Sequence, residues 1–280
     1  MKRNFLSEIL AKKREVLAQI QSESSNSRFR EHAVEVRRTA VPHRLLQALK
    51  SELPRPKIIA EFKRRSPSAG IIRANVSAYE VARRYERGGA CAISVLTDEA
   101  HFGGSIADLR AVRSSTNLPI LRKDFIIDAI QIYEAAIAGA DAVLLIVAAM
   151  DDALLGELRQ VAEDKLGLDA LVEIHTSGEL RRALNAGAKI IGVNNRDLQT
   201  FQVSLETSER LIAKASHDRI MVSESGLQSA ESLRRLHALG FHGFLIGETL
   251  MRAPDPENAL RDFIAEFEIP QVSSAAAHPS

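Results

Sequence analysis

Cysteine is scarce in this chain of 280 residues, and neither sign of charge dominates. The single cysteine, Cys91, cannot form a disulfide within the chain, which excludes the small disulfide-stapled folds. The 37 basic and 36 acidic side chains nearly cancel, so no overall field draws the chain to nucleic acid or to an anionic membrane. An anionic partner must therefore be bound by a local site, and we expect that partner to be a small molecule.

Long apolar runs and metal-binding motifs are missing as well. The longest apolar run, 142–150, is far shorter than the roughly 20 residues of a membrane-spanning helix, and it predicts a buried strand. The N-terminal MKRNFLSEILAKKREVL interrupts its apolar residues with charges, unlike the core of a signal peptide. The histidines form no HxxxH or HxH pair, so we expect no structural or catalytic metal. The single cysteine and the N-terminus without a signal-peptide core together predict a protein of the reducing cytoplasm.

From Lys57 onward, short β-branched apolar runs alternate with longer amphipathic stretches. Successive runs start about 20 to 35 residues apart, which is the size of one strand, one helix and two loops. This spacing suits helical crossovers between parallel strands and not two-residue hairpins. The predicted strands are KIIAEFK (57–63), CAISVLTD (91–98), PILRKDF (119–125), AVLLIV (142–147), ALVEIH (170–175), IIGVNN (190–195), IMVSESG (220–226) and GFLIG (243–247).

Helical patterns between the runs end in glycine just before the next strand, as in AYEVARRYERGG (78–89) and QIYEAAIAGAD (131–141). Glycine at this place suits a left-handed helix C-cap. The same small-residue punctuation recurs at Gly88, Gly139, Gly187 and Gly240. Eight such units with continuous apolar strands predict a parallel sheet that is covered by helices and closed to remove its edges. A doubly wound open sheet is the alternative, but no glycine-rich fingerprint follows the first strand.

The predicted fold class is therefore α/β, a single (β/α)8 TIM barrel with an N-terminal helical extension. Within the extension we expect a helix over 5–20, a polar break over 21–27 and a second helical stretch around 43–51. The extension would cap the bottom of the barrel or line its top, and the sequence leaves both open. The predicted units are the N-terminal helical extension (1–56), the catalytic barrel (57–268) and a disordered tail (269–280).

Polar and charged side chains gather at the C-terminal ends of the predicted strands. Residues of one parity face the inside of a barrel, and catalytic groups of barrel enzymes lie at this end. The set comprises Glu61, Lys63, Lys123, Glu173, Asn194, Arg196 and Glu224. Each one alone could be an ordinary barrel-end ion pair. Burying all of them is costly unless they pair with each other or with a ligand, so the set predicts an acid/base site.

Two further motifs predict a phosphate site. SESG (223–226) follows the seventh run and IGETL (246–250) follows the eighth, and phosphate-binding barrels use these two loops. Gly226 and Gly247 allow close approach of the backbone to an anion, although either motif alone could be a simple turn and cap. The basic loop RRSPSAG (64–70) suits a lid over an anionic ligand, and a solvated surface loop is the alternative.

The motifs of this chain resemble, in order, those of the indole-3-glycerol-phosphate synthase family. They are IAEFKRRSPSAG (59–70), LRKDFIID (121–128), LVEIHT (171–176), IGVNNRDL (191–198), SESG (223–226) and FLIGETLM (244–251). The resemblance extends from about Phe5 to about Glu266, and the combination of KRRSPS, KDF and NNRDL is specific. It implies ring closure, decarboxylation and dehydration of 1-(2-carboxyphenylamino)-1-deoxyribulose 5-phosphate in tryptophan biosynthesis. It also implies that no cofactor takes part.

The resemblance assigns catalytic roles by matching position. Lys123 would be the general acid that protonates the ribulose carbonyl, and nearby cations would draw its pKa toward neutrality. Glu173 would be the acid/base partner in the later loss of the hydroxyl and the proton, with Lys63 as a competing general acid. Glu61 and Asn194 would hold the reacting hydroxyl groups.

The resemblance also implies residues that bind the substrate. Arg196 and Glu224 would orient the ribulose chain, and Lys63 with Ser66 would close over the anionic groups. The phosphate would lie against the backbone N–H groups of Ser225, Gly226, Gly247 and Glu248. Glu248 departs from the small hydroxyl residue of some members, which leaves open where its carboxylate points. The anthranilate ring would lie between Phe102, Phe125, Leu144 and Leu198.

Two rival interpretations remain at this point. An aldose–ketose isomerase acting on phosphoribosylanthranilate would share the barrel and its phosphate loops, but it needs a cysteine or aspartate pair, and Cys91 lies at the wrong end of its strand. A barrel that only binds a phosphate metabolite would not need Lys123 and Glu173. For the oligomeric state we expect a monomer, with a homodimer as the alternative.

Overall fold

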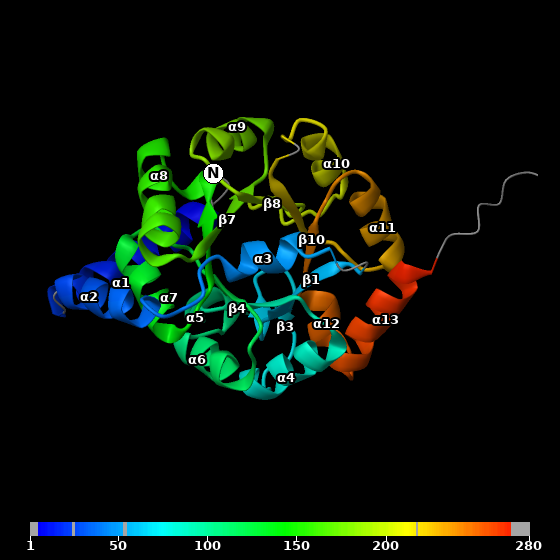
Figure 1. The fold of residues 1–280 in the computed structure, drawn as a ribbon, viewed down its shortest axis with the longest axis horizontal. Coiled ribbons are helices and arrows are strands. Elements are labelled where there is room, and N and C mark those ends of the chain that lie inside the picture. The colour runs from blue at the N-terminus through cyan, green and yellow to red at the C-terminus, as the bar shows by residue number, and fades with distance from the viewer. Residues whose placement is uncertain (1–4, 24–25, 53–54, 217, 270–280) are drawn as a thin grey trace, which may run out of the picture.

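The computed structural model describes residues 5–23, 26–52, 55–216 and 218–269. Eight parallel strands close into a barrel, and the helices surround it as a ring (Figure 1). The closure joins the first strand to the last, with Lys57 opposite Gly243, so the predicted (β/α)8 barrel is confirmed. The barrel strands are β1 (Lys57–Phe62), β4 (Ala92–Leu96), β5 (Ile120–Lys123), β6 (Ala142–Ile146), β7 (Asp169–Ile174), β8 (Ile190–Asn194), β9 (Ile220–Glu224) and β10 (Gly243–Ile246).

Alternation along each strand divides the core into two layers. In β1, Ile58 and Phe62 belong to the outer layer that packs against the helices, whereas Ile59 belongs to the layer inside the barrel. The inner layer is apolar at the bottom and in the middle of the barrel, with side chains such as Leu171 and Val222. Glu61 continues the inward parity of Ile59, so the same alternation delivers its carboxylate to the C-terminal end.

Most of the surrounding helices begin at a side-chain cap, with α10 and α12 as exceptions, and several end at glycine. Gly89 and Gly139 have φ angles of 96° and 93°, so the predicted left-handed C-caps are confirmed. The second of the quoted helices begins at Ala129, because Asp128 is its N-cap. The helices and helical turns after β1 are α4 (Ala78–Gly88), α5 (Glu99–Phe102), α6 (Ile106–Ser115), α7 (Ala129–Ala138), η1 (Val147–Ala149), α8 (Asp152–Gln160), η2 (Val161–Lys165), α9 (Ser177–Asn185), α10 (Glu206–Ile212), α11 (Ala230–Ala238), α12 (Glu248–Arg252) and α13 (Pro256–Glu268).

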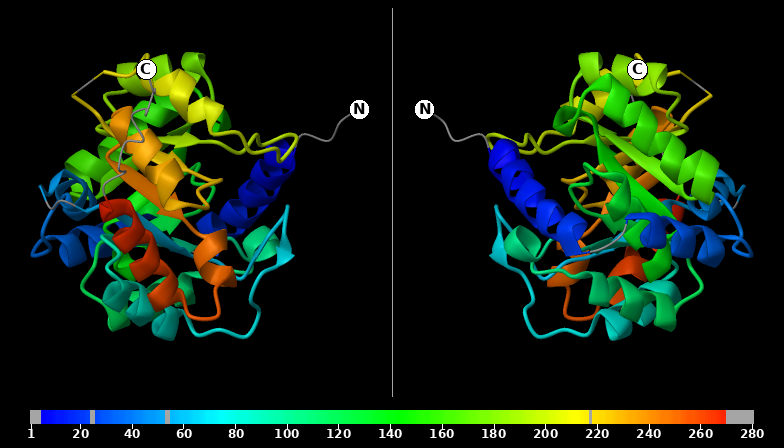
Figure 2. Two further views of the ribbon diagram at one scale, coloured as in Figure 1. Left: turned by 90° about the vertical axis from the view of Figure 1, so that its right-hand side faces the viewer. Right: turned by 90° about the vertical axis from the view of Figure 1, so that its left-hand side faces the viewer.

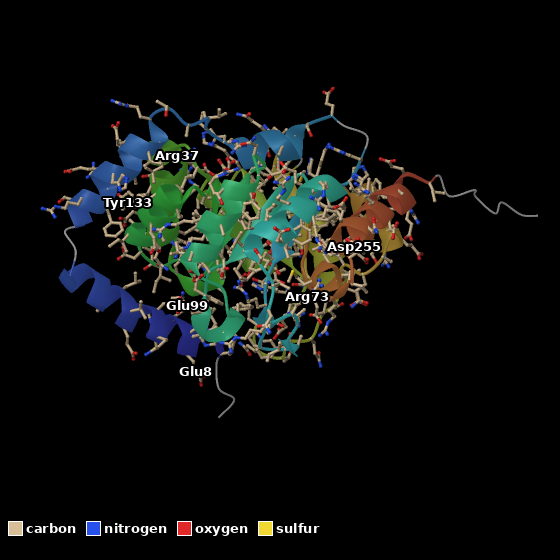
Figure 3. All side chains as sticks on the ribbon, turned by 90° about the horizontal axis from the view of Figure 1, so that it is seen from below. Glu8, Arg37, Arg73, Glu99, Tyr133 and Asp255 are labelled. Carbon is tan, nitrogen blue, oxygen red and sulfur yellow. The ribbon has the colours of Figure 1, made fainter. Side chains whose placement is uncertain are left out.

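The N-terminal extension serves both ends of the barrel. Helix α1 (Phe5–Glu23) lies at the C-terminal end, where Lys13 pairs with Asp98 at 3.1 Å and with Asp124 at 2.6 Å. Helix α3 (Arg44–Lys50) lies at the opposite end and buries Leu49 against the start of β10. Figure 2 shows α1 on the same side as the loop after β8, and Figure 3 places Glu8 of α1 far from Arg37 of α2. The sequence had left open whether the extension caps the bottom of the barrel or lines its top.

One prediction for the extension was wrong and another lies largely outside the described residues. Helix α2 (Asn26–Arg37) begins inside the expected polar break of 21–27 and packs against α7. Of its described side chains, Ala33 is buried whereas Val34 and Val36 are exposed, so its apolar residues show little helical periodicity. The expected helix around 43–51 is confirmed as α3. The predicted tail, apart from Ile269, falls outside the described residues.

The loop after β1 contains a small antiparallel hairpin. Strands β2 (Arg65–Ser66) and β3 (Gly70–Ile71) pair with each other and lie at the end of the barrel that α1 covers (Figure 2). Arg64 anchors the loop through two contacts of 2.7 Å to the carboxylate of Asp108.

None of the helices among the described residues has the length and apolar character needed to span a membrane.

Candidate active site

A buried lysine lies between carboxylates at the C-terminal end of the barrel. The Nζ atom of Lys123 donates to Glu173 Oε2 at 3.0 Å and to Glu224 Oε2 at 2.6 Å. These residues end or nearly end β5, β7 and β9, at positions of inward parity, and at most 9% of any of them is exposed. The structure therefore brings three of the predicted residues into direct contact.

A second ion pair lies beside this cluster. Lys63 Nζ is 2.7 Å from Glu61 Oε1, so these two predicted residues, one on β1 and one just after it, face the same side of the barrel. A Cβ atom at Gly247 would overlap this Glu61 oxygen and would lie 3.0 Å from Lys63 Nζ. Glycine at position 247 therefore leaves the space that the ion pair occupies.

The surroundings of Lys123 correct one expectation. Burial lowers the pKa of Lys123, but the charges of Glu173, Glu224 and Glu61 outweigh burial, and its pKa is raised. The predicted shift toward neutrality was wrong, because the groups around this amine are carboxylates and not cations. The sequence predicted which residues reach the C-terminal end of the barrel, but it did not predict which of these charged groups contact each other.

The two carboxylates that hold Lys123 differ in their own pKa values. Burial raises the pKa of Glu224 to about 7, with the charge of Glu173 acting in the same direction against the pull of Lys123. Glu173 is also buried, but Lys123, His175 and a hydrogen bond from Asn194 outweigh burial and lower its pKa. Glu173 is therefore a stable carboxylate, whereas Glu224 is close to accepting a proton at neutral pH.

Asn194 links the cluster to the loop after β9. Its Oδ1 atom accepts the backbone N–H of Arg196 at 3.0 Å and the hydroxyl of Ser225 at 2.9 Å, which orients its amide nitrogen toward Glu173. Arg196 then reaches across the opening, and its guanidinium donates to Ser68 Oγ at 2.9 Å. A side chain after β8 thereby holds the loop that carries β2 and β3 over the site.

The site has a polar half and an apolar half that share Lys123 and the Glu61–Lys63 pair. The polar half is a cavity of about 1030 Å³, and the apolar half is a smaller cavity of about 120 Å³. The loops after β9 and β10 line the polar half. The predicted residues that line the polar half are Glu61, Lys63, Lys123, Arg196, Glu224, Ser225, Gly226, Gly247 and Glu248. Those that line the apolar half are Glu61, Lys63, Ser66, Phe102, Lys123, Phe125, Leu144, Glu173, Asn194, Arg196, Leu198 and Ser225.

The loops that line the polar half have a backbone conformation suited to binding an anion. Ser225 and Gly226 have φ angles of 66° and 77°, a left-handed pair that favours glycine at the second position. The first bond within α12 runs from the Met251 N–H to the Gly247 oxygen at 2.9 Å. Among the backbone bonds of the described residues outside regular elements, none is donated by Ser225, Gly226, Gly247 or Glu248. These amides can therefore bind an anion.

The side chain of Glu248, whose direction the sequence left open, lies among cations. Its Oε1 atom accepts from Arg252 Nε at 2.9 Å, and its Oε2 atom is 3.9 Å from Arg196 Nη2. Two arginines therefore offset its negative charge beside the proposed anion site.

Two aromatic side chains line the apolar half. The ring centroids of Phe102 and Phe125 are 6.3 Å apart, with an interplanar angle of 37°. Phe125 and Leu144 are nearly fully buried, whereas Phe102 and Leu198 are partly exposed at the mouth. An aromatic ligand in the apolar half would therefore contact both the buried pair, Phe125 and Leu144, and the partly exposed pair, Phe102 and Leu198.

Some residues of the site were not predicted. Phe5 and Leu6 of α1 line the apolar half, and Phe201 lines both halves. No signal in the sequence placed α1 above this cavity. His175 lies 3.6 Å from Glu173, and its position two residues after a rim carboxylate was a signal that could have been used.

Cys91 immediately precedes β4, at the end of this strand that is opposite to the cluster, as expected. Burial raises the pKa of its thiol to about 12, which makes it a poor acid/base group. Within the described ranges, no three side chains of the His, Cys, Asp and Glu types are arranged to hold a metal ion.

A closed (β/α)8 barrel with an acid/base cluster between an apolar and a polar cavity defines a barrel enzyme. A family model described as indole-3-glycerol phosphate synthase matches residues 6–263. Indole-3-glycerol phosphate synthase of Carboxydothermus hydrogenoformans is 46% identical over 93% of this chain and all of its own length. That of Opitutus terrae is 50% identical over 74% of this chain and 80% of its own. The chain belongs to the indole-3-glycerol phosphate synthase family.

Solved structures of more distant proteins share the fold. Thiamine phosphate pyrophosphorylase from Pyrococcus furiosus is 18% identical, with a TM-score of 0.55, and the match covers 74% of this chain and 93% of that one. At this level of identity, the similarity concerns the barrel and not the chemistry.

Proposed function

We propose that this chain converts 1-(2-carboxyphenylamino)-1-deoxyribulose 5-phosphate into indole-3-glycerol phosphate, CO2 and water, a step of tryptophan biosynthesis. The family name and the paired cavities support this reaction. The observation that carries the proposal is the position of Lys123 at the junction of an apolar cavity and a polar cavity. A ring in one half and a sugar phosphate in the other would place the bond-forming atoms beside its ammonium group.

The proposed roles follow the order of the chemistry. The ring carbon that bears the carboxylate attacks the ribulose carbonyl, and Lys123 protonates the carbonyl oxygen. The carboxylate then leaves as CO2, and its electron pair restores the ring by neutralising the iminium nitrogen. Finally the new hydroxyl leaves as water and a neighbouring carbon loses a proton, with Glu173 as the acid/base partner and Lys63 as an alternative acid.

The raised pKa of Lys123 bears on the first of these steps. Its ammonium form is the stable form at neutral pH, so the acid is present before the substrate binds. A strongly held proton is donated poorly, and donation requires that the ammonium turn from its carboxylates to a carbonyl that is gaining negative charge. Glu224, with a pKa of about 7, can take up a proton and thereby weaken its hold on the lysine.

The remaining roles concern binding. Glu61 and Asn194 would hold reacting hydroxyl groups, Arg196 and Glu224 would orient the ribulose chain, and Lys63 with Ser66 would close over the anionic groups. Their place on the cavity walls supports these assignments. The aromatic ring would be enclosed by Phe102, Phe125, Leu144 and Leu198.

The direct test of the proposal is an assay with the substrate itself. Purified protein is incubated with the carboxyphenylamino-deoxyribulose phosphate, and indole fluorescence and released CO2 are followed together. Formation of both products at equal rates is expected. Fluorescence without CO2, or neither signal, would contradict the proposal.

The phosphate site yields a prediction that needs no catalysis. Inorganic phosphate should shift the amide ¹⁵N and ¹H resonances of Ser225, Gly226, Gly247 and Glu248, because these residues line the polar half and their N–H groups donate none of the backbone bonds found outside regular elements of the described residues. Phosphate should also inhibit competitively with the substrate. Shifts confined to other loops would show that the anion binds elsewhere.

A further prediction concerns metal ions. Lys123 and Glu173 can supply the protons, and the iminium accepts the electrons of decarboxylation, so the reaction has no step that requires a Lewis acid. We expect activity to persist after exhaustive dialysis against EDTA. Loss of activity that Mg²⁺ or Zn²⁺ restores would contradict this account.

The chain is further proposed to act as a monomer in the cytoplasm. The described residues place the whole acid/base cluster within one chain, which supports activity without a partner subunit. The single cysteine supports a reducing compartment.

A further inference from the structure

His175 is a buried imidazole that the proposed chemistry does not use. It follows β7 directly, and 13% of its side chain is exposed. Its Nε2 atom is 3.6 Å from Glu173 Oε1, and its Nδ1 atom is 3.4 Å from Glu179 Oε2. Neither ring nitrogen has a hydrogen-bond partner among the residues that the structure describes. The ring therefore lies between two carboxylates at ion-pair distance.

Glu179 fixes the outer side of this arrangement. It belongs to the first turn of α9, and its Oε2 atom accepts the backbone N–H of His175 at 2.7 Å. Thr176 caps the same helix by accepting the Glu179 N–H at 3.2 Å. Burial raises the pKa of Glu179, but its contacts with the ring and with the backbone N–H of His175 outweigh burial, and the pKa is lowered. The stable carboxylate of Glu179 thus lies beside Nδ1 of the imidazole, whereas Glu173 lies beside Nε2.

The charges around the ring favour the imidazolium form. Burial lowers the pKa of His175, but Glu179 and Glu173, with a smaller contribution from Glu224, outweigh burial and raise it. The positive charge of His175 also contributes to lowering the pKa of Asp197, in the loop after β8. The charges that raise the pKa of the ring are carboxylates from β7, α9 and β9, and Asp197 adds another from the loop after β8. The cation nearest to this group is Lys123 of β5, which is bound to the other oxygen of Glu173.

The two oxygens of Glu173 have different cationic partners. Oε2 accepts from Lys123, whereas Oε1 faces His175. When Lys123 gives its proton to the substrate, it becomes neutral while Glu61, Glu173 and Glu224 remain nearby. Without a second cation, Glu173 would then be drawn to the protonated, uncharged state.

We propose that His175 is a positioning residue that holds Oε1 of Glu173 and keeps this side chain a carboxylate after Lys123 has lost its charge. Oε2 then points to the substrate and can accept the proton that leaves during dehydration. This inference rests on the proposed function, because it assigns Glu173 the role of base. It identifies His175 and Glu179 as the support of that base.

The first test is the pH dependence of kcat in His175→Gln. Loss of the cation raises the pKa of Glu173, so the pH below which the base is protonated and inactive moves upward. We expect the acid limb of the kcat profile to shift upward by about one pH unit, with KM little changed. The matched control is His32→Gln, because His32 is exposed on α2, and its profile should equal that of the wild type.

The second test needs neither turnover nor a folded His175 variant. With ¹³C-labelled histidine, the His175 resonance should titrate above the ordinary pKa of about 6.5 in the wild type. Glu173→Gln and Glu179→Gln should each lower that pKa, because each removes one of the flanking charges. A His175 pKa that neither substitution changes would overturn the inference.

The two tests also separate this inference from the proposed function. An active wild-type enzyme whose kcat profile survives His175→Gln unchanged would overturn the positioning role and leave the proposed function intact. A wild-type protein that forms no indole product would overturn the proposed function and, with it, the role in catalysis. The NMR titration would then still decide whether His175 and Glu173 form a charged pair.

Discussion

Lys123→Ala should lower kcat by at least about a hundredfold, with a far smaller change in KM. Removal of a general acid typically reduces the rate by about 10²- to 10⁴-fold, which corresponds to several kcal/mol of transition-state stabilisation. In the free enzyme the ammonium of Lys123 is already bound by Glu173 and Glu224. We therefore expect it to contribute little to substrate binding and to act mainly in the transition state. Steady-state assays of indole formation under saturating substrate measure this effect.

Glu173→Gln should have an effect of similar size on kcat. The amide keeps the shape of the side chain but cannot accept a proton, and it leaves Lys123 with one fewer negative partner. Lys63→Ala is the informative comparison, because Lys63 lies at the mouth of the site and can contact anionic groups of the bound substrate. We expect Lys63→Ala to raise KM and to lower kcat.

One result would reassign the general acid. If Lys123→Ala retained nearly normal kcat while KM rose, Lys123 would only bind the substrate, and Lys63 would be the acid. Circular dichroism of each variant checks that the barrel is intact, since removal of one member of a buried ion cluster leaves uncompensated charges.

Gly192→Ala should reduce kcat by up to about a hundredfold although residue 192 contributes no side chain to the chemistry. Gly192 lies on β8 opposite Glu173 of β7 and Val222 of β9, and its inward side faces the lysine cluster. A Cβ atom there would overlap Glu224 Oε1 and lie 3.2 Å from Leu171 Cδ1. The Glu224 carboxylate, whose other oxygen accepts from Lys123, must then change position. Displacement of a catalytic group by about 1 Å is enough to cause a loss of this size.

Two other glycines provide matched controls for this substitution. Gly156→Ala adds the same methyl group within α8 where no atom lies within 4 Å, so it should keep full activity and slightly raise the unfolding temperature. Gly104→Ala would overlap the backbone oxygen of Leu96, which cannot rotate away, so we expect it to lower the unfolding temperature. A Gly192→Ala enzyme with wild-type kcat would show that Glu224 can move without affecting Lys123.

Much of the barrel was predictable because its signals are local. A strand alternates its side chains with a period of two, and a helix ends where glycine can take a left-handed conformation. These rules located all eight strands and placed Glu61, Lys123, Glu173 and Glu224 on the inward face at one end. The loops after β9 and β10 followed from their position in the repeat. The amino-acid sequence by itself therefore determined which residues reach the rim.

The tertiary structure alone decided which of these residues face each other. Whether carboxylates or cations surround Lys123 depends on how the strands tilt and where the barrel closes, and these are not properties of any one segment. For that reason the expected direction of the Lys123 pKa shift was wrong, and the sequence did not predict the contact between His175 and Glu173. The position of α1 over the apolar cavity likewise depends on ion pairs with Asp98 and Asp124, far along the chain. Local periodicity carries no information about contacts between segments so distant in sequence.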